Sequence, residues 1–151
     1  DAPNSQTLPP GLEHLFPQQW KRISGKQFRG DFAAVIYRAP AVEMARRLVG
    51  AFQALSSADS ALLLQDPADL TLVGKALASK FPFLKNLTRS DHAPFWERGI
   101  PALMVTDTAE FRNPYYHTDQ DLPHRLDYGR MALVVRATAC LLADLAGRIS
   151  P

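Results

Sequence analysis

The feature that most constrains the fold is residues 32–37, FAAVIY, an apolar run with no polar residue at alternate positions. A strand with one face in water alternates apolar and polar residues, whereas a strand covered on both faces reads as an unbroken apolar run. Its β-branched and aromatic members favour a strand over a helix. The run therefore predicts a strand in the middle of an α/β sheet with helices on both of its faces.

The rest of the chain alternates helical and strand patterns around this run. Apolar residues recur at helical spacing after Pro40, which sits near the first turn of that predicted helix. Residues 61–64 and 102–106 read as two further short strands. A last helix of about five turns is predicted after Asp127, a suitable N-cap residue. One apolar stripe of this helix should face the core, and it comprises Met131, Val134, Val135, Leu141, Leu142 and Leu145.

The first 30 residues differ from the rest in their content of helix breakers. Prolines and glycines are dense there, so an irregular arm with one short helical turn is expected over residues 1–30. Residues 31–151 then form the α/β portion, because strands and helices in alternation pack as layers. A weak helical pattern over residues 70–81 is broken by Gly74 and ends at Pro82.

Composition and charge exclude several classes of function. A chain of 151 residues with 46% hydrophobic residues can bury one ordinary core. A net charge of +2, evenly scattered, argues against a nucleic-acid partner. The apolar runs are far shorter than the roughly 20 residues that span a bilayer, so no membrane anchor is expected. Cys140 is the only cysteine, which excludes an intrachain disulfide. A soluble protein is expected, and its compartment stays open, with secretion or a periplasmic location compatible.

Two loop segments concentrate the polar chemistry, residues 89–96 and 113–121. Ser90, Asp91 and His92 contain the residue types of a serine hydrolase triad, but three consecutive side chains point apart and no G-x-S-x-G elbow is present. Ser90 or Asp91 capping the following helical turn is the better interpretation. His117 stands near carboxylates of the kind that bind zinc together with imidazole, but no H-E-x-x-H and no second His at ligand spacing is present, so the residues alone favour a structural histidine over a ligand.

Four blocks of sequence, in order and spacing, carry a resemblance to a known family. They are residues 89–96 (RSDHAPFW), 99–104 (GIPALM), 113–118 (NPYYHT) with Asp121, and 126–128 (LDY) before a long helix. Together they resemble the C-terminal part of the dinuclear zinc aminopeptidases of the S and Y type, whose relatives include glutaminyl cyclases. The resemblance implies a three-layer α/β/α fold with a mixed, mostly parallel sheet, and two zinc ions held at strand ends.

The resemblance also implies roles for individual residues. His117 matches the family's last metal ligand, and Asp91 matches an aspartate that supports the site through hydrogen bonds without touching metal. Tyr116 matches a tyrosine that donates to the oxyanion, with simple packing as its alternative. The implied pocket for the substrate side chain comprises Tyr115, Phe95 and Trp96, of which Phe95 and Trp96 are also natural packing residues.

The remaining ligands and the general-base glutamate of that family have no counterpart in this chain. We therefore expect the C-terminal part of a zinc exopeptidase, inactive and without tightly held zinc by itself, and the missing initiator Met favours a piece of a longer enzyme. The alternatives are a non-catalytic peptidase-like binding module and a fragment of a glutaminyl cyclase-like acyltransferase. Expected partners are the N-terminus of a peptide substrate, and either a second copy or an N-terminal half that completes the sheet.

Overall fold

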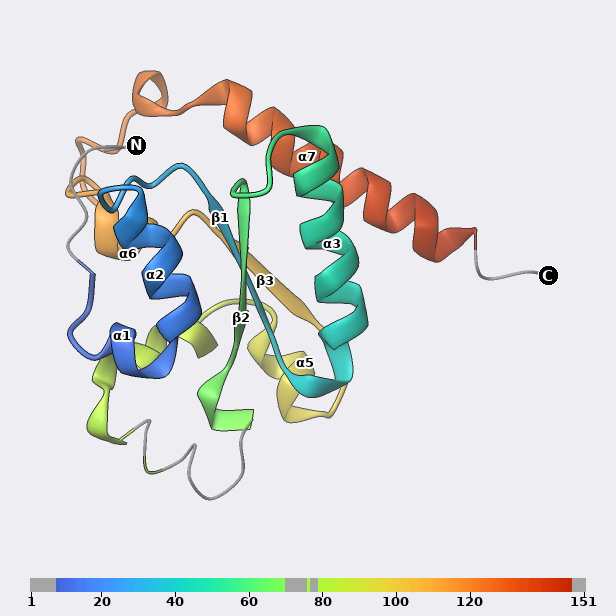
Figure 1. Ribbon diagram of the computed structural model, residues 1–151, viewed down its shortest axis with the longest axis horizontal. Helices are drawn as coiled ribbons and strands as arrows, with labels where there is room; N and C mark the ends of the chain where they lie inside the picture. The colour runs from blue at the N-terminus through green and yellow to red at the C-terminus, as the bar shows by residue number, and fades with distance from the viewer. Residues whose placement is uncertain (1–7, 70–75, 77–78, 148–151) are drawn as a thin grey trace.

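The computed structural model describes residues 8–69, 76 and 79–147, and it shows a mixed sheet between layers of helices (Figure 1). The central strand is β1 (Ala33–Tyr37), which pairs in parallel with β2 (Ala61–Gln65) and antiparallel with β3 (Leu103–Thr106). These three strands fall where the sequence predicts them. The expected α/β class with a mixed sheet is confirmed.

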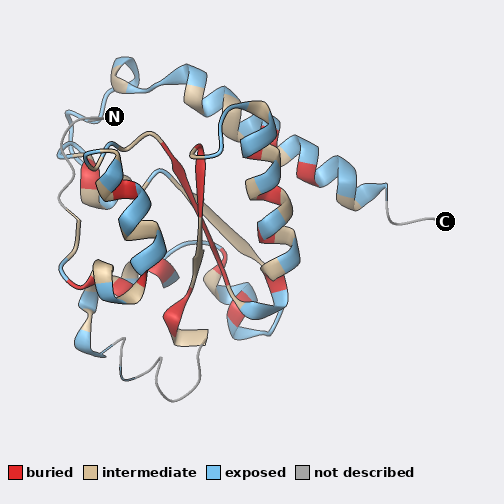
Figure 2. Cartoon of the chain, in the orientation of Figure 1, coloured by how far each residue is buried: buried red, intermediate tan, exposed pale blue. Residues whose placement is uncertain are grey.

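Strand β1 is buried along its whole length, as Figure 2 shows. Its alternate side chains divide between the two faces of the sheet, because successive side chains in a strand point to opposite sides. Ala33, Val35 and Tyr37 belong to the cluster under α3 (Val42–Leu55), whereas Ile36 belongs to a separate cluster on the other face. The prediction that helical layers cover both faces of this strand is confirmed.

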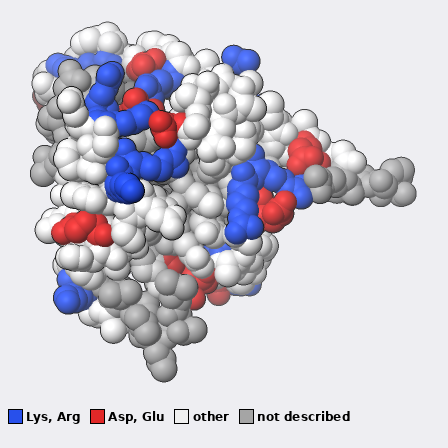
Figure 3. Space-filling view, in the orientation of Figure 1, with Lys and Arg blue, Asp and Glu red and all other residues white. Residues whose placement is uncertain are grey.

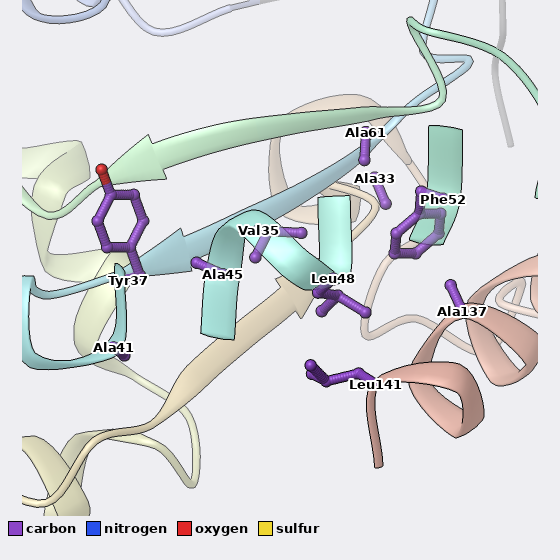
Figure 4. Packing of buried hydrophobic residues seen from close by; sticks show 10 residues of the cluster. All are labelled: Ala33, Val35, Tyr37, Ala41, Ala45, Leu48, Phe52, Ala61, Ala137 and Leu141. Carbon is purple, nitrogen blue, oxygen red and sulfur yellow. The ribbon is translucent and has the colours of Figure 1, made fainter. Parts of the chain in front are cut away.

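The core on the first face lies between β1, α3 and the last helix, α7 (Tyr128–Ala146) (Figure 4). Leu48 and Phe52 of α3 are each only 1% exposed, and Ala137 and Leu141 of α7 complete the cluster. Truncating a side chain as buried as Leu48 to Ala typically costs about 2–5 kcal/mol. This cluster therefore holds α7 to the sheet through α3.

Helix α7 begins where the sequence predicts, because the Asp127 carboxylate accepts a hydrogen bond from the Arg130 backbone N–H at 3.0 Å. Its predicted single apolar stripe, however, divides into two flanks. One flank packs against the core cluster and includes Val134, Leu141 and Leu145. The other is exposed and includes Met131, Val135 and Leu142, of which Val135 is 67% exposed. The prediction of one buried stripe is wrong because only one flank of the apolar surface of α7 lies against the core cluster, and the other faces solvent.

The second face of the sheet is covered by shorter elements. These are α1 (Leu12–Leu15), α2 (Pro17–Gly25), the 3₁₀ segment Pro82–Thr88 and α5 (Ala93–Glu97). Where the sequence predicts an irregular arm, α2 is a helix of nine residues. Pro17 is tolerated because the first helical position needs no N–H donor, and Ile23 packs on Phe32 and Leu62. The predicted helix over residues 70–81 falls largely outside the described residues.

Surface charge is mixed in sign on the face shown in Figure 3. Asp59 is in ion-pair contact with both Arg22 and Lys26, and Arg47 of α3 contacts Asp144 of α7 at 3.0 Å. The pKa of Asp59 lies below its usual value, first because of the Arg22 hydrogen bond and then because of the Lys26 hydrogen bond. Within the described residues, helices are too short or too polar to cross a membrane.

Candidate functional site

The candidate site begins at the C-terminal end of β3, where a tight corner leads into the short helix α6 (Ala109–Arg112). Thr108 begins α6 with a left-handed backbone, φ 64°, which is rare for a β-branched residue. The Thr106 hydroxyl accepts from the Thr108 N–H at 2.9 Å, and the Asp107 carboxylate accepts from the Ala109 N–H at 2.9 Å. We call residues 107–112 the β3–α6 corner.

The next nine residues, 113–121, fold back on themselves, and we call them the His117 loop. The Asn113 side chain joins the start of the loop to its end. Its amide oxygen accepts from the Tyr115 N–H at 3.0 Å, and its amide nitrogen donates to the Asp121 carboxylate at 3.3 Å. The Thr118 hydroxyl donates to the Tyr115 carbonyl at 2.7 Å. The loop therefore derives its shape from its own side chains, and a carboxylate at position 121 acts as an acceptor within it.

His117 lies at the exposed tip of this loop with a left-handed backbone, φ 60°. Its ring meets the Tyr116 ring edge-on, with centroids 4.1 Å apart and planes at 77°. Tyr116 is itself 42% exposed. The two neighbouring residues that the resemblance expects as a metal ligand and an oxyanion donor thus have their rings in contact, and both residues are exposed.

Tyr115, expected in the substrate pocket, lies under a cation. The Arg125 guanidinium carbon is 3.9 Å from the centroid of the Tyr115 ring, a close cation–π contact. Arg125 follows the loop in a 3₁₀ turn, Pro123–Arg125. Sequence reasoning did not single it out, since a basic residue ten positions from a tyrosine carries no recognisable spacing.

Asp91 is exposed, in the turn between the 3₁₀ segment Pro82–Thr88 and α5. Two contacts tie this region to α6: the Arg89 guanidinium pairs with Glu110 at 2.8 Å, and the rings of Phe83 and Phe111 meet edge-on at 6.4 Å. The first polar segment is therefore anchored to the helix that precedes the His117 loop. The predicted capping of α5 by Ser90 or Asp91 is wrong, because its cap residue is His92 and no side-chain cap bond forms.

Phe95 and Trp96 differ in their surroundings. Trp96 is buried, its indole N–H donates to the Ala102 carbonyl at 3.0 Å, and Arg38 lies over its ring at 4.5 Å. Phe95 is 50% exposed. Their helix, α5, precedes β3 while α6 follows it, so the two helices lie near opposite ends of that strand (Figure 1). The contacts of Trp96 favour the packing alternative, and β3 separates both residues from the His117 loop.

Arg112, at the end of α6, is the buried cation of this region and was not anticipated from the sequence. Burial lowers its pKa to about 10; Asp107 and Asp31 act in the opposite direction, while Arg130 adds to the lowering. A short helix between two polar loops gives no periodic signal of burial, so sequence patterns could not have identified it.

The described residues do not complete a metal site. Among them, no group of three or more His, Cys, Asp or Glu side chains is arranged to hold an ion. A catalytic zinc site needs three protein ligands and an open position. What this part of the chain offers is one exposed imidazole on a closed loop, in contact with the ring of a tyrosine.

Comparison with known proteins places the chain in a family. The family model described as "Peptidase family M28" matches residues 43–142 of this chain, a range that includes the β3–α6 corner and the His117 loop. A protein of Escherichia coli (strain K12), "Uncharacterized protein YfbL", is 35% identical over 143 residues, covering 93% of this chain and 36% of the relative. The chain thus spans about a third of that relative's length. No solved structure matches. Because the match covers about two thirds of the chain, including α3, β2, β3, most of α7 and the candidate site, the chain belongs to peptidase family M28.

Proposed function

We propose that this chain is the C-terminal part of a dinuclear zinc aminopeptidase of the S and Y type, which removes N-terminal residues from peptides. Peptidases of family M28 are generally zinc-dependent. The observation that carries the proposal is His117, an exposed imidazole at the tip of a loop that its own hydrogen bonds hold closed. Such a loop presents a ligand nitrogen outward with little freedom, as a metal ligand requires.

The proposed roles of the neighbouring residues come from the resemblance, and the following contacts support them. His117 would supply one ligand to zinc. Tyr116, whose ring touches that of His117, would place its hydroxyl where a developing oxyanion needs a donor. Asp91 would support the site from the segment that the Arg89–Glu110 pair anchors. Tyr115 would line the substrate pocket with Arg125 behind its ring.

The chain alone should be inactive. One imidazole cannot hold zinc against water, and the described residues form no ligand cluster around it. The other ligands and the general base would come from a portion of the domain that this chain does not cover, since the relative is much longer. A non-catalytic binding module on the same fold is the second candidate, favoured by that incomplete ligand set.

Two measurements test the proposal. The full-length gene product should contain zinc after dialysis and cleave aminoacyl anilides, and His117→Ala should abolish both zinc retention and turnover while leaving the fold intact. His124→Ala, on an exposed histidine of the following turn, is the matched control and should change neither. A zinc-free, inactive wild type supports the binding module. Full zinc and activity in His117→Ala would remove His117 from the site, and activity on N-terminal glutamine would indicate a cyclase.

A further inference from the structure

Arg112 makes the most unusual set of contacts near the candidate site. It is 8% exposed, and its guanidinium lies over the Phe32 ring, 4.6 Å from the centroid. Its Nε donates to the Thr108 hydroxyl, one terminal nitrogen donates to the Asp107 carbonyl, and the same nitrogen reaches the Phe32 carbonyl at 3.5 Å. The partners of this one side chain thus come from the end of β3, the start of α6 and the residue before β1.

An ion pair does not account for the burial of this cation. Among the described residues, no carboxylate is in ion-pair contact with Arg112. A buried charge without an ion-pair partner is costly, and its hydrogen bonds add to the longer-range attraction of Asp107 and Asp31 in compensating that cost. All of these hydrogen bonds are made to the β3–α6 corner and to the adjacent start of the central strand. The contacts of Arg112 therefore serve this corner.

The corner also holds an unfavourable backbone. Thr108 is β-branched and left-handed, and such residues persist only where their surroundings over-determine them. Arg112 and Thr106 supply that constraint, by bonding to the hydroxyl and to the N–H of Thr108. Asn113, the first residue of the His117 loop, follows Arg112 directly and donates its N–H to Ala109 at 2.7 Å. The direction of the loop is thus set by this corner.

We propose that Arg112 is a positioning residue, whose guanidinium fork locks the β3–α6 corner and so fixes the direction in which the His117 loop leaves the sheet. This inference rests on the proposed role of His117. Lysine cannot replace Arg112, because a single ammonium cannot reach the Thr108 hydroxyl and two carbonyls in one plane. Charge alone is therefore insufficient, and the geometry of the fork is what the corner uses.

The test compares Arg112→Lys with Arg98→Lys in the full-length protein, at a temperature where both are folded. Arg98 is an exposed arginine at the C-terminal end of α5, before β3 in the chain, and it donates to the Pro94 carbonyl at 3.2 Å. Arg112→Lys should lower kcat on an aminoacyl anilide by about 10–100-fold with a smaller change in KM. It should also shift the imidazole NMR signal of His117, identified by its loss in His117→Ala. Arg98→Lys should leave both unchanged.

If Arg112→Lys does not fold, a second pair of variants, at Thr108, tests the same hydrogen bond from its acceptor side. Thr108→Val removes the hydroxyl that accepts from Arg112 and keeps the branched shape, whereas Thr108→Ser keeps the hydroxyl. Thr108→Val should reproduce the loss in kcat and the shift of the imidazole signal, and Thr108→Ser should resemble the wild type.

The outcomes separate this inference from the proposed function. Wild-type kcat and an unshifted imidazole signal in folded Arg112→Lys, or in folded Thr108→Val, would overturn the positioning role and assign Arg112 to stability alone. An inactive wild type would overturn the peptidase proposal instead. The imidazole signal would then decide the role of Arg112, since it reports the loop directly and needs no turnover.

Discussion

The left-handed backbone of His117 allows its chemical role to be separated from its structural cost. A residue other than glycine pays about 1–2 kcal/mol in this conformation. Glycine avoids that cost but loses about 0.5–1 kcal/mol more conformational entropy on folding. His117→Gly and His117→Ala both remove the imidazole and its contact with the Tyr116 ring, so the contact cancels between them. His117→Gly should therefore be about 0.5–1 kcal/mol more stable than His117→Ala.

The assay is urea unfolding of both variants with a chelator present, so that metal binding adds nothing. For a domain of this size, 1 kcal/mol corresponds to roughly 2–4 °C in Tm, which thermal unfolding can resolve. Asp119, in the same loop, is not left-handed and provides the control. There the order should reverse, with Asp119→Gly less stable than Asp119→Ala by about 0.5–1 kcal/mol.

The result that refutes this reasoning is His117→Ala at least as stable as His117→Gly, since the loop would then not hold position 117 in the left-handed region. The role of His117 as a zinc ligand is tested by a separate measurement, the zinc content of the same two variants. Both variants of the full-length protein should retain no zinc, because glycine and alanine offer no ligand. Zinc retained in either variant would show that stability, rather than ligation, is what His117 contributes.

Three further outcomes are expected. Tyr116→Phe in the full-length protein should lower kcat with little change in KM, because its hydroxyl would act only in the transition state; a normal kcat in steady-state assays would exclude the oxyanion role. Asp127→Ala should cost about 1 kcal/mol in urea unfolding, because it removes the acceptor for the Arg130 N–H, while Asp127→Asn should cost much less. We expect the 151-residue chain to self-associate through the exposed flank of α7 and the outer edge of β3, which among the described strands pairs only with β1. Val135→Lys should reduce that association, and a monodisperse wild-type monomer in concentrated solution by light scattering would contradict it.

The central sheet and its two long helices could be predicted because their signals are dominated by burial. An unbroken apolar run such as residues 32–37 has few stable solutions other than a central strand. The helical spacing after Pro40 and the N-cap at Asp127 are similarly local. Helix α2 was missed because proline and glycine frequencies describe a segment on average, whereas Pro17 occupies the one helical position that tolerates it.

The division of the α7 stripe into buried and exposed flanks could not be read from the sequence. Periodicity identifies which residues share a face, but the width of the partner surface decides how many of them are covered. Val134 and Val135 are adjacent and chemically identical, yet only Val134 packs against the core cluster. The crossing of α7 over α3 determines that difference, and it is a property of the assembled fold.

The candidate site shows the same limit at finer scale. The sequence identified the segment 113–121 because polar groups gather just after a strand, where α/β folds carry their chemistry. It could not show that His117 is left-handed, that Tyr116 touches it, or that Arg112 is buried beneath the corner. Those properties come from contacts between segments far apart in sequence, such as Arg112 with Phe32.

The contacts also predict how the site should respond to substitution. At the tip of the loop, His117 and Tyr116 are exposed and their rings meet, so replacement of either side chain should change chemistry with little effect on folding. At the base, Arg112 and Thr108 are bound to several parts of the fold, so their replacement should change folding and chemistry together. A base bound to several parts of the fold, carrying an exposed tip, lets one imidazole be held in a fixed direction without being buried, which the proposed ligand role of His117 would require.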